Sequence, residues 1–365
     1  MPERPALRVV DFGTVSPLRS QTLWHAVAYG VGAGAPPTLS FVRTRSPYVS
    51  IGFHRSLDEL DTDRCGHAGW PVYRRMVGGG PVYLDHDQLC FQLTLPAAAV
   101  PADRQRALRQ LLTPAVAAFR AAGLDAHLDH DLEVVVGDRK VCGHGAAQIG
   151  SSVVVVGNLI ERFDHTAAAS VLRAPDADEA GETLRLMRRY VAFDGSGPDV
   201  DAAAFADAAC RAYGAALGLA PRPGALSALE AAQLVGLDRR LRDPAWTRGR
   251  PRLAGPAGTA PVGTAPVGTA PTGTAPAGTA PVWKVKVRAG VWRCSVLEPA
   301  GKVAASVVHG RVQRLVVQAD GVDPARAAAA AEGLTVAAAA DAARRWGPAG
   351  PAVAGALRQI QQEAA

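Results

Sequence analysis

The chain is best approached from one stretch, Arg74-Arg75-Met76-Val77-Gly78-Gly79-Gly80-Pro81-Val82-Tyr83-Leu84-Asp85. Apolar segments typical of strands lie on either side of it, at residues 70–73 and 89–95. A glycine triplet inside a folded domain costs backbone entropy, so it usually marks a sharp bend or a close approach to another group. With guanidinium groups beside it, that group can be an anion such as a phosphate. An ordinary glycine-rich loop with solvated arginines fits the same pattern.

A second stretch carries a lysine, in the sequence Glu133-Val134-Val135-Val136-Gly137-Asp138-Arg139-Lys140-Val141-Cys142-Gly143-His144-Gly145-Ala146-Ala147-Gln148. Gly137-Asp138 between two strand-like runs predicts a β-hairpin. Lys140 then lies where the hairpin returns, and a Gly-x-Gly turn follows it. Taken alone, Lys140 would be interpreted as a solvated surface residue.

Together, the two stretches resemble the lipoate–protein ligase A family of the biotin/lipoate protein ligase superfamily. The resemblance rests on Arg-Arg-x-x-Gly-Gly-Gly-x-Val-Tyr-x-Asp followed, in the expected order and spacing, by Gly-x-Arg-Lys-Val-x-Gly. The segment Tyr48-Val49-Ser50-Ile51-Gly52-Phe53-His54 is also similar to the strand and turn that precede the arginine motif in that family. The likeness covers roughly residues 20–220. Residues after 282 are more weakly similar to the family's small accessory domain.

The resemblance implies a reaction and a set of site residues. Lipoate or octanoate would be activated by ATP, with Mg²⁺, to an acyl-adenylate, and the acyl group would pass to a lysine of a carrier domain. By position, the nucleotide would contact Arg74, Gly78, Gly79, Gly80, Pro81, Val82 and Lys140. The acyl substrate would contact Arg74, Gly79, Lys140, Gly143 and His144. Lys140 is implied as the catalytic residue, because its ammonium would bridge the acyl carbonyl and the phosphate.

The same resemblance implies the partners, which would be lipoyl domains of 2-oxoacid dehydrogenases or the H protein of glycine cleavage. Net charge is +6 without a dense basic run, so no nucleic-acid partner is predicted. No apolar run approaches the length of a membrane span, and no signal peptide is apparent, so a cytoplasmic protein is expected. The five dispersed cysteines favour neither a disulfide framework nor a zinc site, and no acidic cluster identifies Mg²⁺ ligands, so no metal site is assigned.

Some positions depart from the family pattern. Leu84 and Val156 stand where many members have histidine, and Cys142 stands where a serine or another small residue is usual. Octanoyltransferases of the superfamily use a cysteine nucleophile, but neither expected nucleophile position holds one here. Cys142 is interpreted as a small buried thiol, although an acyl-cysteine there is conceivable. Two alternatives therefore stay open: a cysteine-dependent transferase that uses acyl carrier protein, and a non-catalytic homologue that binds carrier domains.

Periodicity predicts an α+β fold, with a mixed, largely antiparallel sheet flanked by helices and a small α+β accessory domain at the C-terminus. The predicted domains are a catalytic domain at residues 1–245, a linker at 246–282 and an accessory domain at 283–365. The linker is assigned from five copies of Gly-Thr-Ala-Pro plus one small residue, which cannot bury a core.

Four finer expectations concern single elements. Ser20 is expected to cap the first helix, and residues 324–346 are expected to form one helix. The run Asp129-His130-Asp131 is expected to be a polar loop and not a site. The alternating cations Lys284, Lys286 and Arg288 are expected on a solvated strand edge, or facing an acidic acceptor.

Overall fold

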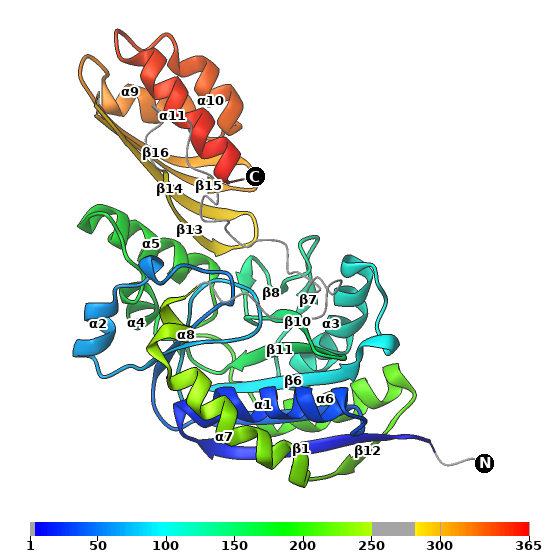
Figure 1. Ribbon diagram of the computed structural model, residues 1–365. Helices are drawn as coiled ribbons and strands as arrows, with labels where there is room; N and C mark the ends of the chain where they lie inside the picture. Colours follow the sequence, from blue (N-terminus) through cyan, green and yellow to red (C-terminus); the bar gives the residue numbers. More distant parts are fainter. Residues whose placement is uncertain (1–3, 250–281, 300, 365) are drawn as a thin grey trace. The chain divides into compact units, whose positions relative to one another are not determined.

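The structure is a computed structural model that describes residues 4–249, 282–299 and 301–364 (Figure 1). The chain divides into two compact units. The first comprises Met1–Arg173 and Ala192–Val267, and the second comprises Ala174–Val191 and Gly268–Ala365. Most of the linker predicted at 246–282 falls on residues 250–281, which lie outside the described residues, whereas residues 246–248 belong to helix α8 (Pro244–Arg248) and Val282 begins strand β13 (Val282–Arg288).

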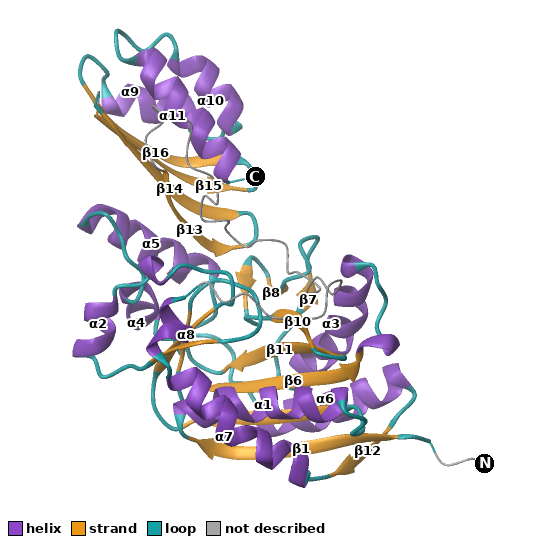
Figure 2. Ribbon diagram, viewed as in Figure 1, coloured by secondary structure: helices purple, strands orange, loops and turns teal. Residues whose placement is uncertain are grey.

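A six-stranded sheet forms the centre of the first unit, in the order β10-β11-β6-β2-β1-β12 (Figures 1 and 2). Its strands are β1 (Ala6–Val15), β2 (Thr38–Thr44), β6 (Gln88–Pro96), β10 (Gly145–Ile149), β11 (Ser152–Ile160) and β12 (Ala220–Pro223). β1 runs parallel to β2 and β12, whereas the remaining neighbours are antiparallel. The sheet is thus mixed and mainly antiparallel, which confirms the predicted α+β class.

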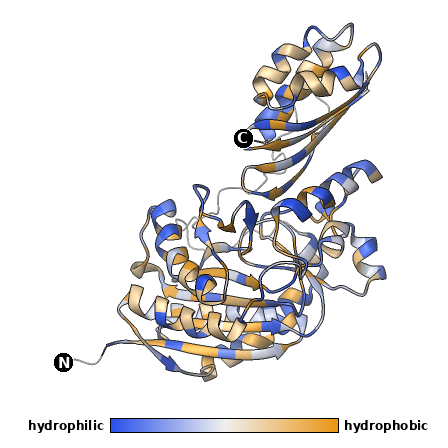
Figure 3. Cartoon of the chain, turned by 180° about the vertical axis from the view of Figure 1, so that it is seen from behind, coloured by the Kyte–Doolittle hydropathy of each residue, from blue (hydrophilic) through white to orange (hydrophobic). Residues whose placement is uncertain are grey.

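Helices cover both faces of this sheet. The long ones are α1 (Pro17–Gly32), α3 (Arg104–Ala121), α6 (Ala202–Leu217) and α7 (Ala228–Arg242). α3 packs with α6, and α1 packs with α7. Along β6, Phe91 and Leu93 are buried in the core that α3 and α6 complete. Gln92, between them, is buried and accepts a hydrogen bond from Ser40 Oγ at 2.8 Å. The strands of this sheet carry mostly the hydrophobic colour in Figure 3.

The first helix begins earlier than predicted. Its cap is Ser16, whose hydroxyl accepts from the Arg19 amide at 3.4 Å, and Pro17 occupies the first helical turn. Proline has no amide hydrogen to leave unsatisfied there, so the helix can start at that point. Ser20 is buried inside the helix, where its hydroxyl donates to Pro17 O at 2.8 Å and lies 2.9 Å from the Tyr48 hydroxyl oxygen.

Two small three-stranded sheets hold the stretches that the sequence singled out. One has the order β4-β3-β5 and the other β7-β8-β9. Their strands are β3 (Tyr48–Ile51), β4 (Val72–Arg74), β5 (Val82–Leu84), β7 (His127–Leu128), β8 (Val134–Val136) and β9 (Arg139–Lys140). The short helical elements of this unit are η1 (Leu57–Glu59), α2 (Thr62–His67), η2 (Ala97–Ala99), α4 (His165–Ser170) and α8 (Pro244–Arg248).

The second unit is an antiparallel meander with helices. Its sheet has the order β13-β14-β15-β16, and its C-terminal helices are rich in alanine. The strands are β13 (Val282–Arg288), β14 (Val291–Glu298), β15 (Gly301–Val308) and β16 (Arg311–Ala319). The helices are α5 (Ala177–Tyr190), α9 (Pro324–Ala331), α10 (Val336–Ala343) and α11 (Gly350–Glu363).

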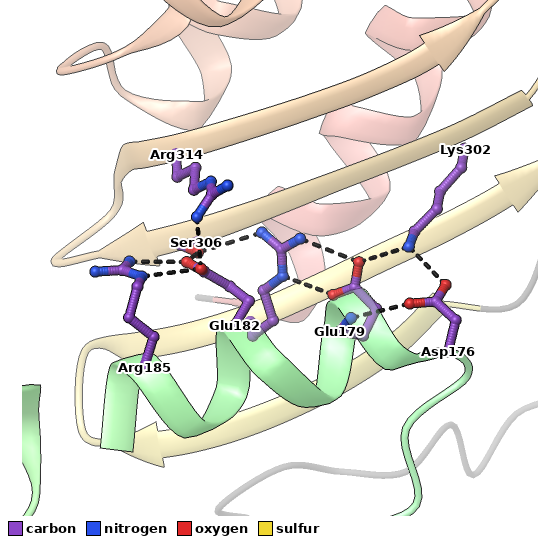
Figure 4. Close-up of polar contacts among 8 residues, drawn as sticks. Asp176, Glu179, Glu182, Arg185, Lys302, Ser306 and Arg314 are labelled. Carbon is purple, nitrogen blue, oxygen red and sulfur yellow. Dashed lines mark hydrogen bonds and ion pairs between the residues drawn. The ribbon is translucent and has the colours of Figure 1, made fainter. Parts of the chain in front are cut away.

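α5 comes from the middle of the chain, yet it packs on the C-terminal sheet. Leu186 and Tyr190 are buried with Val291 of β14. Glu179 takes two hydrogen bonds from the fully buried Arg293, at 2.6 and 3.0 Å, and Glu182 bonds Ser306 and Arg314 (Figure 4). These partners satisfy the two carboxylates, as buried charges require. The sequence-based boundaries did not separate α5 from the catalytic domain.

Three further differences from expectation concern local structure. The predicted domain boundary at 245 falls inside α8. The predicted helix 324–346 is broken at Gly333, which has φ +80° and donates its amide to Val312 O at 2.8 Å. Lys284 does not face solvent, because its side chain is only 8% exposed and its ammonium pairs with Glu363 of α11. None of the described helices has the length and apolar character of a transmembrane span.

Candidate active site

The glycine stretch forms the loop between β4 and β5, and both strands pair with β3. Residues 78–82 of this loop are partly exposed, whereas residues 74–77 are buried. Gly79 has φ +97°, a conformation that favours glycine. A Cβ at Gly52 would lie 1.9 Å from Gly79 O, so glycine is also required there for β3 to approach the loop.

The resemblance implies that Arg74 contacts the nucleotide and the acyl substrate, but the structure buries Arg74 in the scaffold of the loop. Its side chain is 0% exposed. The guanidinium donates to carbonyl oxygens, namely those of Gly52, Phe53, Arg55, Trp246 and Thr247 at 2.7–3.2 Å. The Trp246 indole in turn donates to Arg74 O at 3.0 Å. Arg74 therefore joins β4 to the turn after β3 and to α8, and its charge is directed into the scaffold.

Arg75, which the sequence reasoning did not assign to the site, shapes the glycine loop. Its Nη2 donates to Gly78 O and Gly80 O at 2.8 Å each, and its Nη1 donates to Ser50 O at 2.7 Å. Burial lowers the pKa of Arg75 to about 10, so the group stays charged at neutral pH. Because both carbonyls turn toward Arg75, the loop can turn its amides outward. Within the described part of the chain, the Gly79 and Gly80 amides have no protein acceptor.

His25 of α1 also supports this loop and was missed from the sequence. The Met76 amide donates to His25 Nε2 at 3.1 Å, and His25 Nδ1 lies 2.5 Å from Gln21 O. Since Nε2 accepts, the ring carries its proton on Nδ1. Burial lowers the pKa of His25 to about 3, so the imidazole is neutral at physiological pH. A lone histidine in a helix offered no motif by which to identify it.

Lys140 lies at the return of the predicted hairpin. Gly137, with φ +53°, forms the turn, and Lys140 stands opposite Val135. Its ammonium lies 2.7 Å from Glu133 Oε1. The Lys140 side chain is 20% exposed and that of Glu133 is 7% exposed. Lys140 is thus a positioned cation that still reaches solvent.

The turn after Lys140 contacts the glycine loop. A Cβ on Gly145 would lie 3.2 Å from Val77 Cγ1 and 3.4 Å from Gly78 O, so the backbones approach closely there. Gly145 is buried, and Gly143 and His144 before it are partly exposed. The structure therefore brings together the two stretches that lie far apart in sequence.

A buried chain of hydrogen bonds runs from the same turn toward the end of β5. The Gly143 amide donates to Asn158 Oδ1 at 2.6 Å, and Asn158 Nδ2 donates to Gln88 Oε1 at 2.7 Å. Gln88 Nε2 reaches Asp85 Oδ1 at 3.3 Å. Burial raises the pKa of the Asp85 carboxyl. Asn158 and Gln88 had no sequence signal beyond their position in strands.

His144 is neutral in this setting. Burial lowers its pKa to about 4, and its Nδ1 is enclosed without a hydrogen-bond partner among the described residues. An imidazole nitrogen of this kind is suited to contact a substrate group. The structure thus places His144 on the Lys140 turn, as expected from the sequence.

The cysteines nearest to Lys140 in sequence or space are unsuited to nucleophilic attack. Cys142 is 0% exposed, and burial raises its pKa to about 12. Burial likewise raises the pKa of Cys90 to about 12. The thiolate is the reactive form, so both groups are inert thiols at neutral pH. A Cβ on Gly157 would lie 3.2 Å from Cys142 Sγ, which shows how tightly that thiol is packed.

The described residues of this unit do not form a resident metal site. No three His, Cys, Asp or Glu side chains that belong to its described part come close enough together to hold an ion. Asp129 instead supports a turn, because its Oδ1 accepts from the Asp131 and Glu133 amides at 3.0 and 2.9 Å. The predicted polar loop at Asp129-His130-Asp131 is therefore a built turn next to Glu133.

Comparison with known proteins gives a family. The family model described as "Lipoyl protein ligase A/B catalytic domain" matches residues 18–211. An octanoyltransferase LipM from Symbiobacterium thermophilum is 27% identical over 252 residues, which cover 61% of this chain and 90% of that protein.

Solved structures share the fold. A bi-partite lipoate protein ligase from Thermoplasma acidophilum, studied with its E2 lipoyl domain, has a TM-score of 0.62 at 23% identity. The match covers 68% of this chain and 98% of that one. A lipoate-protein ligase A bound with ATP has a TM-score of 0.58 at 21% identity, with 67% of this chain and 99% of that chain covered.

Proposed function

The chain belongs to the lipoyl protein ligase A/B catalytic-domain family, and on this premise we propose that it is an ATP-dependent lipoate– or octanoate–protein ligase. One observation carries the proposal: the Lys140 turn meets the glycine loop at Gly145 and Gly78. In this proposal, the Lys140 ammonium and the Gly79 and Gly80 amides, which have no protein acceptor among the described residues, together neutralise a carboxylate and an α-phosphate.

In the proposed first step, the acyl carboxylate attacks the α-phosphorus of ATP and pyrophosphate leaves. The nucleotide phosphate lies against the backbone of Gly79, Gly80, Pro81 and Val82, with Gly78 shaping the bend. Arg75 holds this bend open by binding the Gly78 and Gly80 carbonyls. Arg74 supports the loop from beneath. Mg²⁺ is proposed to arrive bound to the nucleotide, whose pyrophosphate it would neutralise as that group leaves.

In the proposed second step, the ε-amine of an acceptor lysine attacks the acyl carbon and AMP leaves. The Lys140 ammonium binds the oxygen on which negative charge develops, which is the kind of contact that accelerates acyl transfer. Gly143 and His144 line the acyl side of Lys140. The acceptor is proposed to be a lipoyl domain of a 2-oxoacid dehydrogenase or of the glycine-cleavage H protein. A cytoplasmic location remains a prediction from the sequence.

A second candidate is a cysteine-dependent octanoyltransferase, and the LipM relative favours it. Such a reaction would carry the acyl group on a thiol before transfer to the acceptor. The burial of Cys142 and the raised pKa values of Cys142 and Cys90 speak against that step here. The ligase is therefore the first proposal.

The two reactions differ in their acyl donor, so one experiment separates them. Purified protein is incubated with apo lipoyl domain and either lipoate, ATP and Mg²⁺, or octanoyl–acyl carrier protein without ATP. The ligase predicts acyl-AMP, pyrophosphate and an acyl mass shift on the acceptor in the first mixture only. Transfer in the second mixture that Cys142→Ser abolishes would establish the transferase. Acceptor binding without turnover in either mixture would indicate a non-catalytic homologue.

A further inference from the structure

The Lys140 ammonium has a resident partner. Glu133 Oε1 lies 2.7 Å from Lys140 Nζ, and the Glu133 side chain is only 7% exposed. The two residues belong to the same hairpin, because Val134 O accepts from the Val141 amide and β8 pairs with β9. A carboxylate therefore occupies part of the ammonium surface on which the proposed reaction depends.

The backbone before Glu133 is built to hold this carboxylate in place. Asp129 Oδ1 accepts from the Glu133 amide at 2.9 Å, and Asp129 N donates to Glu133 O at 3.0 Å. Leu132, the preceding residue, has φ +62° and is buried. A branched residue with positive φ is strained, and such strain persists only where the surroundings over-determine the conformation. The turn thus fixes the direction in which Glu133 leaves the backbone.

A fixed carboxylate beside Lys140 affects substrates according to their charge. A free acyl carboxylate that approaches the ammonium must share it with Glu133, and two like charges near one cation repel each other. An uncharged acyl carbonyl can accept a hydrogen bond from the same ammonium without that repulsion. The charge of the acyl group, and not its chain length, is what Glu133 can distinguish.

We propose that Glu133 is a positioning residue that aims the Lys140 ammonium and disfavours a free acyl carboxylate relative to an uncharged acyl group. This inference rests on the proposed function, in which Lys140 contacts the acyl group. If Glu133 acts in this way, the site binds free lipoate or octanoate less tightly than the acyl group of the adenylate. Binding that is weaker in the ground state than later in the reaction favours turnover.

The test compares two ligands of nearly equal shape, lipoate and its neutral amide lipoamide, by titration calorimetry. The proteins are the wild type, Glu133→Gln and a control, Glu161→Gln, which breaks the Arg43–Glu161 ion pair elsewhere in the unit. We expect Glu133→Gln to bind lipoate about tenfold more tightly, or about 1.4 kcal/mol, because the repelling charge is gone. Lipoamide binding should stay within about twofold, and the control should change neither ligand.

The ratio of the lipoate and lipoamide affinities is insensitive to partial unfolding of a variant. Both ligands are titrated into the same preparation, so the fraction of folded protein is the same for both. Glu133→Asp, which keeps the charge, should keep a ratio closer to that of the wild type than Glu133→Gln. Equal changes for both ligands, or weaker lipoate binding in Glu133→Gln, would overturn the role of Glu133 while leaving the ligase proposal intact. Failure of the wild type to bind either ligand would overturn both proposals.

Discussion

Arg74 and Lys140 carry the same charge and both stand next to glycine turns, but the structure gives them opposite settings. Arg74 is 0% exposed, and its guanidinium donates to backbone carbonyls of two segments, residues 52–55 and 246–247. The Lys140 side chain is 20% exposed and pairs with one carboxylate of its own hairpin. A cation whose donors are taken up by the backbone supports the fold, whereas a partly exposed cation can exchange partners with a substrate.

The strongest way to break this comparison is to remove the charge of Arg74. Arg74→Met keeps much of the volume but leaves the Gly52, Phe53 and Thr247 carbonyls without their donor. We expect the free energy of unfolding to fall by about 3–5 kcal/mol, because buried polar groups lose their partners. Urea unfolding measures this change. A variant as stable as the wild type would show that Arg74 is not a scaffold residue.

A second buried arginine extends the comparison, because Arg293 is buried like Arg74 but donates to the Glu179 carboxylate and the Ser306 hydroxyl. Its side chain is 2% exposed, and its partner Glu179 is 0% exposed. Arg293→Met should lower the free energy of unfolding of that unit by about 3 kcal/mol, since Glu179 is left buried with less compensation. The control is Arg358→Met in the exposed pair with Asp341, for which we expect about 0.5 kcal/mol or less. Equal losses in the two variants would contradict the distinction.

These settings show what the sequence could and could not predict. Glycine spacing and the hairpin signal correctly located the loop, the Lys140 turn and the need for close approach at both. The apolar segments correctly predicted a mixed, largely antiparallel sheet, but the glycine loop and Lys140 lie on the two small sheets β4-β3-β5 and β7-β8-β9. Adjacent arginines with identical chemistry could not be told apart, because the carbonyls that bind Arg74 lie about 20 and 170 residues away in sequence. The Glu133–Lys140 pair follows from hairpin register and could have been found.

The roles of His25 and Asn158 could not be predicted from the sequence for a different reason. Each is a single polar residue inside a regular helix or strand, where the usual expectation is packing or solvation. Their importance arises from tertiary contacts with Met76 and Gly143. The membership of α5 in the second unit could not be predicted from the sequence for the same reason. It becomes visible only in the contacts of Glu179 and Glu182 with buried residues of β14 and β15.

A pH-dependent effect on stability should appear through His25. Its pKa is lowered from 6.5 to about 3, so between these values the unfolded chain binds a proton that the folded protein excludes. Stability from this residue is therefore complete above about pH 6.5 and is lost as the pH falls toward 3, by about 1.4 kcal/mol per pH unit.

The measurement is the difference in unfolding free energy between the wild type and His25→Gln from pH 7 to pH 4. Glutamine can still donate and accept hydrogen bonds at this place, so His25→Gln should lose stability less steeply on acidification. His144 also has a lowered pKa and contributes to both proteins alike. If the unfolding free energies of the wild type and of His25→Gln fall equally steeply with decreasing pH, His25 is not a buried neutral residue.

Removing the charge of Lys140 should change stability little and activity greatly, which is the opposite of the effect expected for Arg74. For Lys140→Gln, the free energy of unfolding and ATP-dependent lipoyl transfer to an apo lipoyl domain are measured on the same preparation. We expect stability within about 1 kcal/mol of the wild type and transfer reduced by at least about 100-fold, because the charge that develops on the acyl oxygen is no longer stabilised. Transfer at the wild-type rate, or a loss of transfer that accompanies unfolding, would contradict this expectation.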